Sequence, residues 1–306
     1  MSQTIDMSVD LAGMHMRSPV MTASGTFASG REFADFIDLE RLGALVTKGV
    51  SSTPWEGNES PRIAETASGM LNSIGLQNPG VEAFCSTDLL YLRALDVPVI
   101  VNVSGHTAEE YVAVIERLER EDRVDAYELN ISCPNVVAGG MAFGTACTAA
   151  ESVTRACRAA TRRPLIVKLS PNVTDIAEIA RSVEAGGADA VSLINTLLGM
   201  SIDTTTFRPR LGRVVGGLSG PAIKPVALRM VWQVAAAVSV PVIGMGGIMD
   251  AEDAAEFLLA GASAVAVGTA NFVDPTSAVR ITDGLAEFCR SRGITRVREL
   301  TGALRV

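Results

Sequence analysis

The amino-acid sequence predicts a single α/β domain over residues 1–306, a (β/α)8 TIM barrel with an N-terminal β-hairpin and loops inserted at its rim. Three observations predict this fold. Eight short apolar runs are bounded by turn residues, helical patterns lie between many of them, and the runs are continuous rather than alternating. Continuous apolar runs are typical of parallel strands that are covered on both faces. A strand and a helix repeated along one chain fit a closed barrel better than two domains.

Each element follows from a local pattern. The expected strands are apolar runs that cover 19–25, 44–50, 98–105, 126–133, 164–170, 190–196, 241–247 and 264–270. Apolar residues at helical spacing predict helices over 31–42, 107–121, 151–163, 173–187, 221–238 and 250–261. Before the first strand, SVDLAGMHM alternates around Ala12-Gly13 and predicts a hairpin across the barrel floor. The uncharged stretch 230–249 is long enough to span a membrane, but Pro241 and a change of period indicate a helix followed by a strand.

Composition and charge exclude several classes of function. The chain has 26 Lys plus Arg against 34 Asp plus Glu, a formal charge of -8, and no basic run that could neutralise a phosphate backbone. Nucleic acid is therefore not an expected partner. The N-terminus lacks the pattern of a secretion signal, so we expect a cytoplasmic protein without membrane association. Five scattered cysteines, none spaced as C-x-x-C, indicate reduced thiols and no metal or iron–sulfur cluster held by this chain alone.

Polar residues stand where the predicted strands end. They are Ser24, Lys48, Asn102, Asn130 with Cys133, Lys168, Asn195 with Thr196, Gly246 with Gly247, and Gly268 with Thr269. The carboxyl-terminal rim is where barrels of this class build their sites. A simpler interpretation is that polar residues mark strands emerging into water. Two lysines and three asparagines end five strands without a carboxylate among them, which favours an anionic ligand rich in amide groups.

Glycine-rich segments predict a phosphate site on the same rim. Strand seven ends in GMGG (244–247) and strand eight in VGTAN (267–271), and the loops after these strands commonly bind phosphate in this fold. The segment GGLSG (216–220) adds a third glycine-rich turn. Lys168 could stabilise negative charge on a cofactor ring, or it could extend outward into solvent. No G-x-G-x-x-G is present, so a dinucleotide in a Rossmann unit is not expected.

Seven segments carry a resemblance to a known family. They are ETASGMLNSIGLQNPG (65–80), ELNISCPN (128–135), VKLSPNVTDI (167–176), INTLLGMSID (194–203), GGLSGPAIKPVAL (216–228), IGMGGI (243–248) and AVAVGTANF (264–272). From the hairpin to about residue 290, the chain resembles the soluble, class 1 dihydroorotate dehydrogenases, which use a cysteine base. GMLNSIGLQNPG and INTLLGM are closer to the NAD-linked heteromeric subclass, 1B, than to the fumarate-using homodimers.

The resemblance implies two ligands and a partner chain. FMN would contact Ser24, Lys48, Gly49, Asn102, Asn130, Lys168, Ile194, Gly220, Gly246, Gly247, Gly268 and Thr269. Dihydroorotate or orotate would contact Lys48, Asn72, Ser73, Ile74, Gly75, Leu76, Asn130, Asn195 and Thr196, and no metal site is implied. The implied partner is an electron-transfer subunit that carries FAD and a 2Fe-2S cluster and reduces NAD+. A homodimer of this chain within a heterotetramer is also implied.

The implied reaction oxidises (S)-dihydroorotate to orotate in de novo pyrimidine (UMP) biosynthesis. The substrate loses a hydride from C6 to FMN and a proton from C5. Cys133 is the implied base, and it leads into PNVVAGGMAFGT, whose glycines suit a movable lid. From spacing alone, Cys133 could instead be a small residue that fills the corner after a strand. His15 and His106 fall in no motif and are assigned to the surface or to packing.

Four alternatives stay open at this stage. The nearest is the fumarate-linked homodimeric enzyme of the same family. A dihydropyrimidine-reducing relative would share the barrel and the cysteine but act on uracil-like rings without a carboxylate. A flavin-free isomerase or lyase could use the same phosphate loops, and it would be colourless. A flavin-binding scaffold would be yellow, but dihydroorotate would not bleach it.

Overall fold

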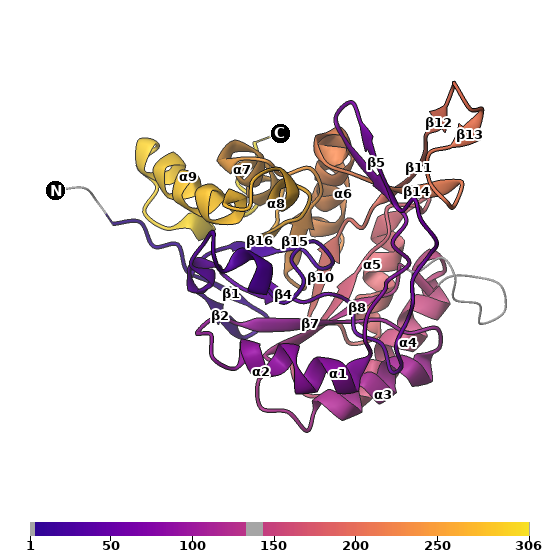
Figure 1. Ribbon diagram of the computed structural model, residues 1–306. Coiled ribbons are helices and arrows are strands. Elements are labelled where there is room, and N and C mark those ends of the chain that lie inside the picture. Colours follow the sequence, from indigo (N-terminus) through magenta and orange to yellow (C-terminus); the bar gives the residue numbers. More distant parts are fainter. Residues whose placement is uncertain (1–3, 133–142, 306) are drawn as a thin grey trace.

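A computed structural model, described here for residues 4–132 and 143–305, contains the predicted barrel (Figure 1). Its parallel strands are β3 (Val20–Thr22), β4 (Leu45–Val46), β7 (Val99–Val103), β8 (Ala126–Asn130), β9 (Leu165–Lys168), β10 (Ala190–Leu193), β15 (Val242–Met245) and β16 (Ala264–Val267). They form one sheet in the order β3-β16-β15-β10-β9-β8-β7-β4. The two edge strands meet, because Gly43 N donates to Val20 O at 2.7 Å and Thr22 N to Ala44 O at 3.3 Å. The eight-stranded prediction is confirmed.

Helices surround the strands, as Figure 1 shows. The longer ones are α3 (Ala108–Leu118), α4 (Cys147–Ala160), α5 (Ile176–Ala185), α6 (Lys224–Ala235), α7 (Ala251–Leu259) and α9 (Ser277–Ser291). Shorter elements are α1 (Val81–Ser86), α2 (Asp88–Leu92), α8 (Ala270–Val273) and the 3₁₀ turns η3 (Phe143–Thr145), η4 (Pro221–Ile223) and η5 (Val297–Leu300). In α3 the buried residues recur at helical spacing, and Thr107 caps the first turn by accepting from Glu110 N. Such buried stripes attach the helices to the sheet.

One helix prediction is wrong. Residues 31–42 form two separate 3₁₀ turns, η1 (Arg31–Phe33) and η2 (Leu39–Arg41), and no α-helix. The Asp38 side chain accepts from Glu40 N at 3.0 Å and so starts a second turn where a helix would have continued. Phe36, one of the apolar residues of the helical pattern, is 61% exposed.

The N-terminal hairpin is confirmed as β1 (Val9–Leu11) paired antiparallel with β2 (Met14–Met16). Its turn residues, Ala12 and Gly13, both have positive φ, as a two-residue type I′ turn requires. Leu11 and Met16 are fully buried. The Met16 methyl group lies beside Gly43, which precedes β4, so the hairpin covers the amino-terminal end of the barrel.

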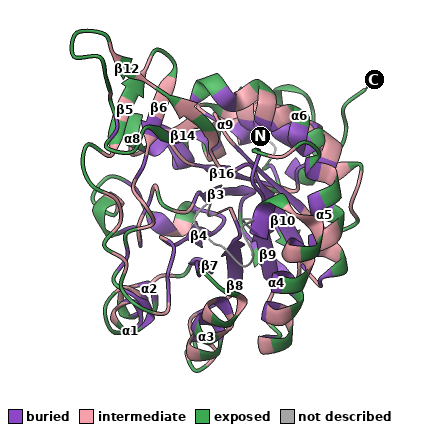
Figure 2. Ribbon diagram, turned by 90° about the vertical axis from the view of Figure 1, so that its right-hand side faces the viewer, coloured by how far each residue is buried: buried purple, intermediate pink, exposed green. Residues whose placement is uncertain are grey.

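The rim insertions form a sheet of their own. It is antiparallel, in the order β11 (Leu197–Met200), β14 (Val215–Ser219), β6 (Gly69–Asn72), β5 (Ile63–Thr66), and a small hairpin of β12 (Ile202–Asp203) and β13 (Arg208–Pro209) follows β11. The sequence predicted inserted loops here but no strands. Figure 2 shows the barrel strands buried and β12 exposed. A Cβ on Gly217 would lie 2.1 Å from Thr196 Oγ1, so glycine is required where this sheet meets the end of β10.

The uncharged stretch 230–249 is divided between α6 and β15, as predicted. Within the described ranges, none of the helices combines the length and the apolar character that crossing a membrane requires.

Candidate active site

One large cavity opens at the carboxyl-terminal ends of the barrel strands. Its volume is about 1030 Å³, at the upper end of the range for small-molecule sites. Residues at the ends of all eight barrel strands line it, and so do β6, β14 and the loops between them.

The cavity collects nearly every residue that the sequence assigned to a ligand. Its lining includes Ser24, Lys48, Gly49, Asn72, Ser73, Ile74, Gly75, Leu76, Asn102, Asn130, Lys168, Ile194, Asn195, Thr196, Gly220, Gly246, Gly247, Gly268 and Thr269. Cys133 lies outside the described residues. The two residues that precede it, Ile131 and Ser132, line the cavity.

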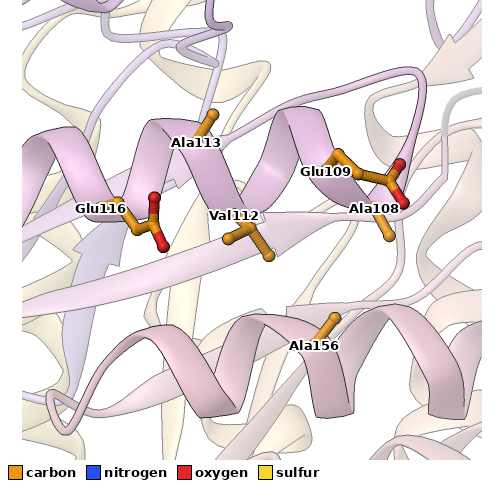
Figure 3. Close-up of a pocket in the computed structure, with 6 residues that line it drawn as sticks. All are labelled: Ala108, Glu109, Val112, Ala113, Glu116 and Ala156. Carbon is orange, nitrogen blue, oxygen red and sulfur yellow. The ribbon is translucent and has the colours of Figure 1, made fainter.

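A second hollow lies on the outside of the barrel, between α3 and α4 (Figure 3). It measures about 260 Å³, and its walls are Ala108, Val112, Ala113 and Ala156 with the carboxylates of Glu109 and Glu116. These side chains are small or acidic, and no basic or amide side chain lines the groove. It is a shallow packing gap between helices rather than an active site.

Two lysines, Lys48 and Lys168, line the large cavity. Neither Lys48 nor Lys168 forms an ion pair within 4.0 Å with any described residue. Lys168 is 5% exposed, and its Nζ donates to Ser24 Oγ at 3.0 Å. Burial, together with the charge of Lys168, lowers the pKa of Lys48 below its ordinary value. A bound anion would offset the cost of burying these two cations and the repulsion between them.

Asparagine amides form a connected group beside the lysines. Asn195 Nδ2 donates to Asn130 Oδ1 at 3.2 Å, and Asn195 Oδ1 accepts from Thr196 N at 2.8 Å. Asn72 Nδ2 donates to Gly217 O at 3.3 Å. Because its Oδ1 already accepts from Asn195, Asn130 can offer a ligand the Nδ2 donor. The buried Tyr111 hydroxyl donates to Asn130 O at 2.7 Å and holds the end of β8 in place.

The 73–76 loop is held by a segment that the sequence did not mark as functional. Asn58 Nδ2 donates to Ser73 O and to Ser73 Oγ at 3.2 Å, and Asn58 N donates to Ile74 O at 3.0 Å. Trp55 and His106 lie with ring centroids 4.1 Å apart, and both line the cavity. His106, expected only at the surface or in packing, therefore also contributes to the site wall. These residues are isolated in irregular loops, so no local pattern could have identified them.

The glycine-rich loops pack against one another on one side of the cavity. Gly220, Gly246 and Gly247 all have positive φ, and a Cβ on Gly247 would lie 2.9 Å from Gly220 O. Thr269 Oγ1 donates to Ser219 Oγ at 2.8 Å, which links the loop after β16 to the end of β14. Exposed backbone N–H groups in such loops suit a phosphate.

A buried carboxylate was missed by the sequence reasoning. Glu128 in β8 is 1% exposed, and its carboxylate accepts from Asn102 Nδ2 at 2.7 Å and from Ser192 Oγ at 2.8 Å. The expectation of strand ends without carboxylates holds, because Glu128 lies two residues before Asn130. A charged residue inside a continuous apolar strand, in phase with Asn130, was the signal that could have revealed it.

Comparisons with known proteins agree with this geometry. The family described as "Dihydroorotate dehydrogenase" matches residues 6–289. A protein of Alkaliphilus oremlandii named "Dihydroorotate dehydrogenase B (NAD(+)), catalytic subunit" is 58% identical over 299 residues, 98% of this chain and 99% of that protein. Proteins with the same name from Geotalea uraniireducens and Bacteroides fragilis are 58% and 55% identical, over 98% of this chain and 98% and 99% of their own lengths.

Proposed function

The chain belongs to the dihydroorotate dehydrogenase family, and from this we propose that it is the catalytic subunit of an NAD-linked dihydroorotate dehydrogenase of the B type. It oxidises (S)-dihydroorotate to orotate in de novo pyrimidine (UMP) biosynthesis. One observation carries the proposal. A single cavity at the barrel mouth combines two lysines that form no ion pair with a described residue, a group of asparagine amides and a cradle of glycine loops.

The residues around the glycine cradle fit FMN, which supplies the hydride acceptor when bound. Glycines at 220, 246 and 247 leave backbone close to the space for a phosphate, and Lys168 supplies a cation for the ring. The buried Asn102 Oδ1 has no hydrogen-bond partner among the described residues, as expected of an acceptor meant for a ligand. We assign FMN to Ser24, Lys48, Gly49, Asn102, Asn130, Lys168, Ile194, Gly220, Gly246, Gly247, Gly268 and Thr269.

The asparagine side chains of the cavity bind the pyrimidine ring of the substrate. Dihydroorotate carries alternating N–H donors and C=O acceptors beside a carboxylate. Asn72, Asn130 and Asn195 can match the ring edge, while Lys48 binds the carboxylate. Ser73, Ile74, Gly75 and Leu76 close one wall, and Thr196 extends the site next to Asn195. A site with several buried amides rejects analogues that leave them unpaired.

Cys133 takes the proton from C5. It directly follows Ser132, whose hydroxyl donates to Lys168 O at 3.3 Å and which lines the cavity. A thiol with an ordinary pKa of about 8.5 is mostly protonated at neutral pH, so turnover should rise with pH unless the site lowers that value. Cys133→Ser should retain FMN and lose most of its turnover at neutral pH. Unchanged turnover would remove Cys133 from the mechanism.

The electrons leave through a second protein. The relatives named above are catalytic subunits of an NAD(+)-linked enzyme, which supports a partner that carries FAD and a 2Fe-2S cluster and reduces NAD+. The cysteines Cys85, Cys147, Cys157 and Cys289 are free thiols, and the described residues contain no group of metal-binding side chains. We also propose a cytoplasmic enzyme in which a homodimer of this chain forms the centre of a heterotetramer.

An anaerobic titration of the purified chain with dihydroorotate tests the proposal. The flavin absorbance should bleach, and the chain alone should then reduce artificial acceptors but not NAD+. A colourless protein would favour a phosphate-binding isomerase or lyase, and a yellow protein that dihydroorotate does not bleach would favour a scaffold. Rapid reoxidation by fumarate would favour the homodimeric subclass.

A further inference from the structure

The buried carboxylate beneath the cavity lacks a counter-ion among the described residues. Glu128 shares the inward face of β8 with Asn130, because residues two apart on a strand point the same way. Both of its oxygens accept hydrogen bonds from neutral groups, Asn102 Nδ2 on β7 and Ser192 Oγ on β10. No basic side chain of the described residues lies within 4.0 Å of it. An unpaired buried carboxylate is costly, so its presence needs a reason beyond packing.

The hydrogen bond from Asn102 to Glu128 has a defined direction. The carboxylate oxygen accepts this hydrogen bond, so the group of Asn102 that faces it is the NH2. The Asn102 amide is thereby fixed with Oδ1 directed away from Glu128. A hydroxyl or a water in place of the carboxylate could accept or donate, and it would leave the amide free to turn over.

The Asn102 side-chain oxygen lies beside the backbone of Gly49. Asn102 lines the cavity, and its Oδ1 is buried without a partner among residues 4–132 and 143–305. A Cβ on Gly49 would lie 3.0 Å from Asn102 Oδ1 and 2.8 Å from Ser104 Oγ, a hydroxyl that also lacks a partner in this part of the chain. The absence of a side chain at Gly49 therefore leaves room for this acceptor, which is buried but not hydrogen-bonded by the described residues.

We propose that Glu128 is a positioning residue that fixes Asn102 as a hydrogen-bond acceptor toward the imide N–H of a bound flavin ring. The inference rests on the function proposed above, because it concerns the same cofactor site. An isoalloxazine ring carries this single imide N–H between two carbonyl groups. An amide turned the wrong way would place its donor where the ring requires an acceptor. Ser192 Oγ donates to the other carboxylate oxygen, the one that does not accept from Asn102.

The first test titrates FMN into flavin-depleted protein and follows the quenching of flavin fluorescence. Glu128→Gln preserves the size of the side chain, but a glutamine can present either its oxygen or its NH2 to Asn102, so the amide orientation is lost. We expect the FMN dissociation constant to rise about tenfold, the effect of roughly one hydrogen bond. Ser192→Ala removes the other bond to Glu128 and is the matched control, with a change of under about twofold.

Double variants separate positioning from a general structural effect. In an Asn102→Ala background, Glu128→Gln should have no further effect on FMN affinity, because Glu128 acts only through Asn102. The exchange Asn102→Asp with Glu128→Gln restores a fixed acceptor at position 102, because the glutamine now donates to the aspartate. The exchanged protein should bind FMN more tightly than either single variant.

Three results would overturn the inference. They are wild-type FMN affinity in E128Q, an equal loss from E128Q in the Asn102→Ala background, and an exchanged variant that binds no better than the singles. Far-UV circular dichroism reports whether each variant folds, and the exchanged variant still decides the question if E128Q alone does not fold. If the wild-type chain itself binds no FMN, the proposed function fails rather than the role of Glu128.

Discussion

Lysines occupy two contrasting environments in this molecule. On α6, Lys224 Nζ donates to Asp253 Oδ1 at 2.5 Å and lies 3.2 Å from Glu256 Oε2, and the Asp253 hydrogen bond raises its pKa. At the cavity, Lys48 has no carboxylate partner among the described residues, and burial lowers its pKa. The described residues pair the first cation, and we propose that a ligand pairs the second. An unpaired buried charge opposes folding, so the contrast marks the site where function outweighs stability.

The small number of lysines in the chain strengthens this contrast. Only Lys48, Lys168 and Lys224 are lysines among the 26 basic residues of the chain, and the remaining 23 are arginines. Arginines make most of the surface ion pairs, such as Arg117 with Glu82 and Glu121. The guanidinium group stays charged and forks across two acceptors, whereas an ammonium group is a compact charge whose pKa responds to burial. Two of the three compact cations lie in the cavity.

The largest effect is expected from Lys48→Met. Loss of the cation that we propose to bind the substrate carboxylate should lower kcat/KM for dihydroorotate by about 10²- to 10³-fold, as for removal of one group that stabilises a transition state. Steady-state kinetics with an artificial acceptor measures this loss, and Lys224→Met is the matched control. A K48M enzyme within tenfold of wild type would break the comparison, because Lys48 would then be no more functional than Lys224.

Lys168→Met should act on the flavin more than on the substrate. Lys168 is 5% exposed as a residue, and its ammonium group donates to Ser24 Oγ at the cavity. The reduction potential of bound FMN should fall by roughly 30–60 mV, which corresponds to about 1.5–3 kcal/mol for a hydrogen bond to a charged group. Dye equilibration under anaerobic conditions measures the potential. An unchanged potential would place Lys168 among the structural cations with Lys224.

The barrel could be predicted from sequence because continuous apolar runs and strand–helix alternation are local signals. The segment 31–42 has helical spacing, but Asp38 caps a new turn and Phe36 is exposed, so tertiary context prevails over the pattern. The sheet at the rim was missed because its pairing is distant in sequence. Asn72 and Gly217, 145 residues apart, face each other across β6 and β14. The outer strands β5 and β11 alternate between partly buried and exposed residues.

Most of the site was predictable because a closed barrel brings every strand end to one mouth, so Lys48, Asn130 and Lys168 had to meet. Asn58 and Trp55 could not be predicted, because their position depends on how the 73–76 loop and the rim sheet fold over the cavity. Glu128 differs from Asn58 and Trp55, because the sequence alone places it two residues before Asn130 and so on the same face of β8.

The stability of the apoprotein should show that the buried charge of Lys48 destabilises the fold. The pKa of Lys48 is lowered on folding, so between its folded pKa and the ordinary 10.5 the unfolded chain binds more protons than the folded chain. The contribution of Lys48 to the free energy of unfolding therefore increases as pH rises through this range. At neutral pH the buried charge destabilises the fold. Flavin-depleted K48M should melt above the wild type near pH 7, with a difference that shrinks toward pH 10. A K48M protein that melts below the wild type at neutral pH would contradict this.

The smallest effect is expected from Lys224→Met. Its ion pairs are partly exposed, with side-chain exposures of 26% for Lys224 and 44% for Glu256, so their loss should cost under about 1 kcal/mol of unfolding free energy. The pKa of Lys224 is raised by Asp253, so its contribution is complete below pH 10.5 and is lost only as pH rises through the folded pKa. The decrease in melting temperature should therefore be constant between pH 6 and 9, whereas the difference between K48M and the wild type shrinks as pH rises from the folded pKa of Lys48 toward 10.5. FMN affinity and kcat should stay near wild type. A tenfold loss of either would mean that Lys224 also affects the cavity through Gly247, which lies next to the Cβ of Lys224.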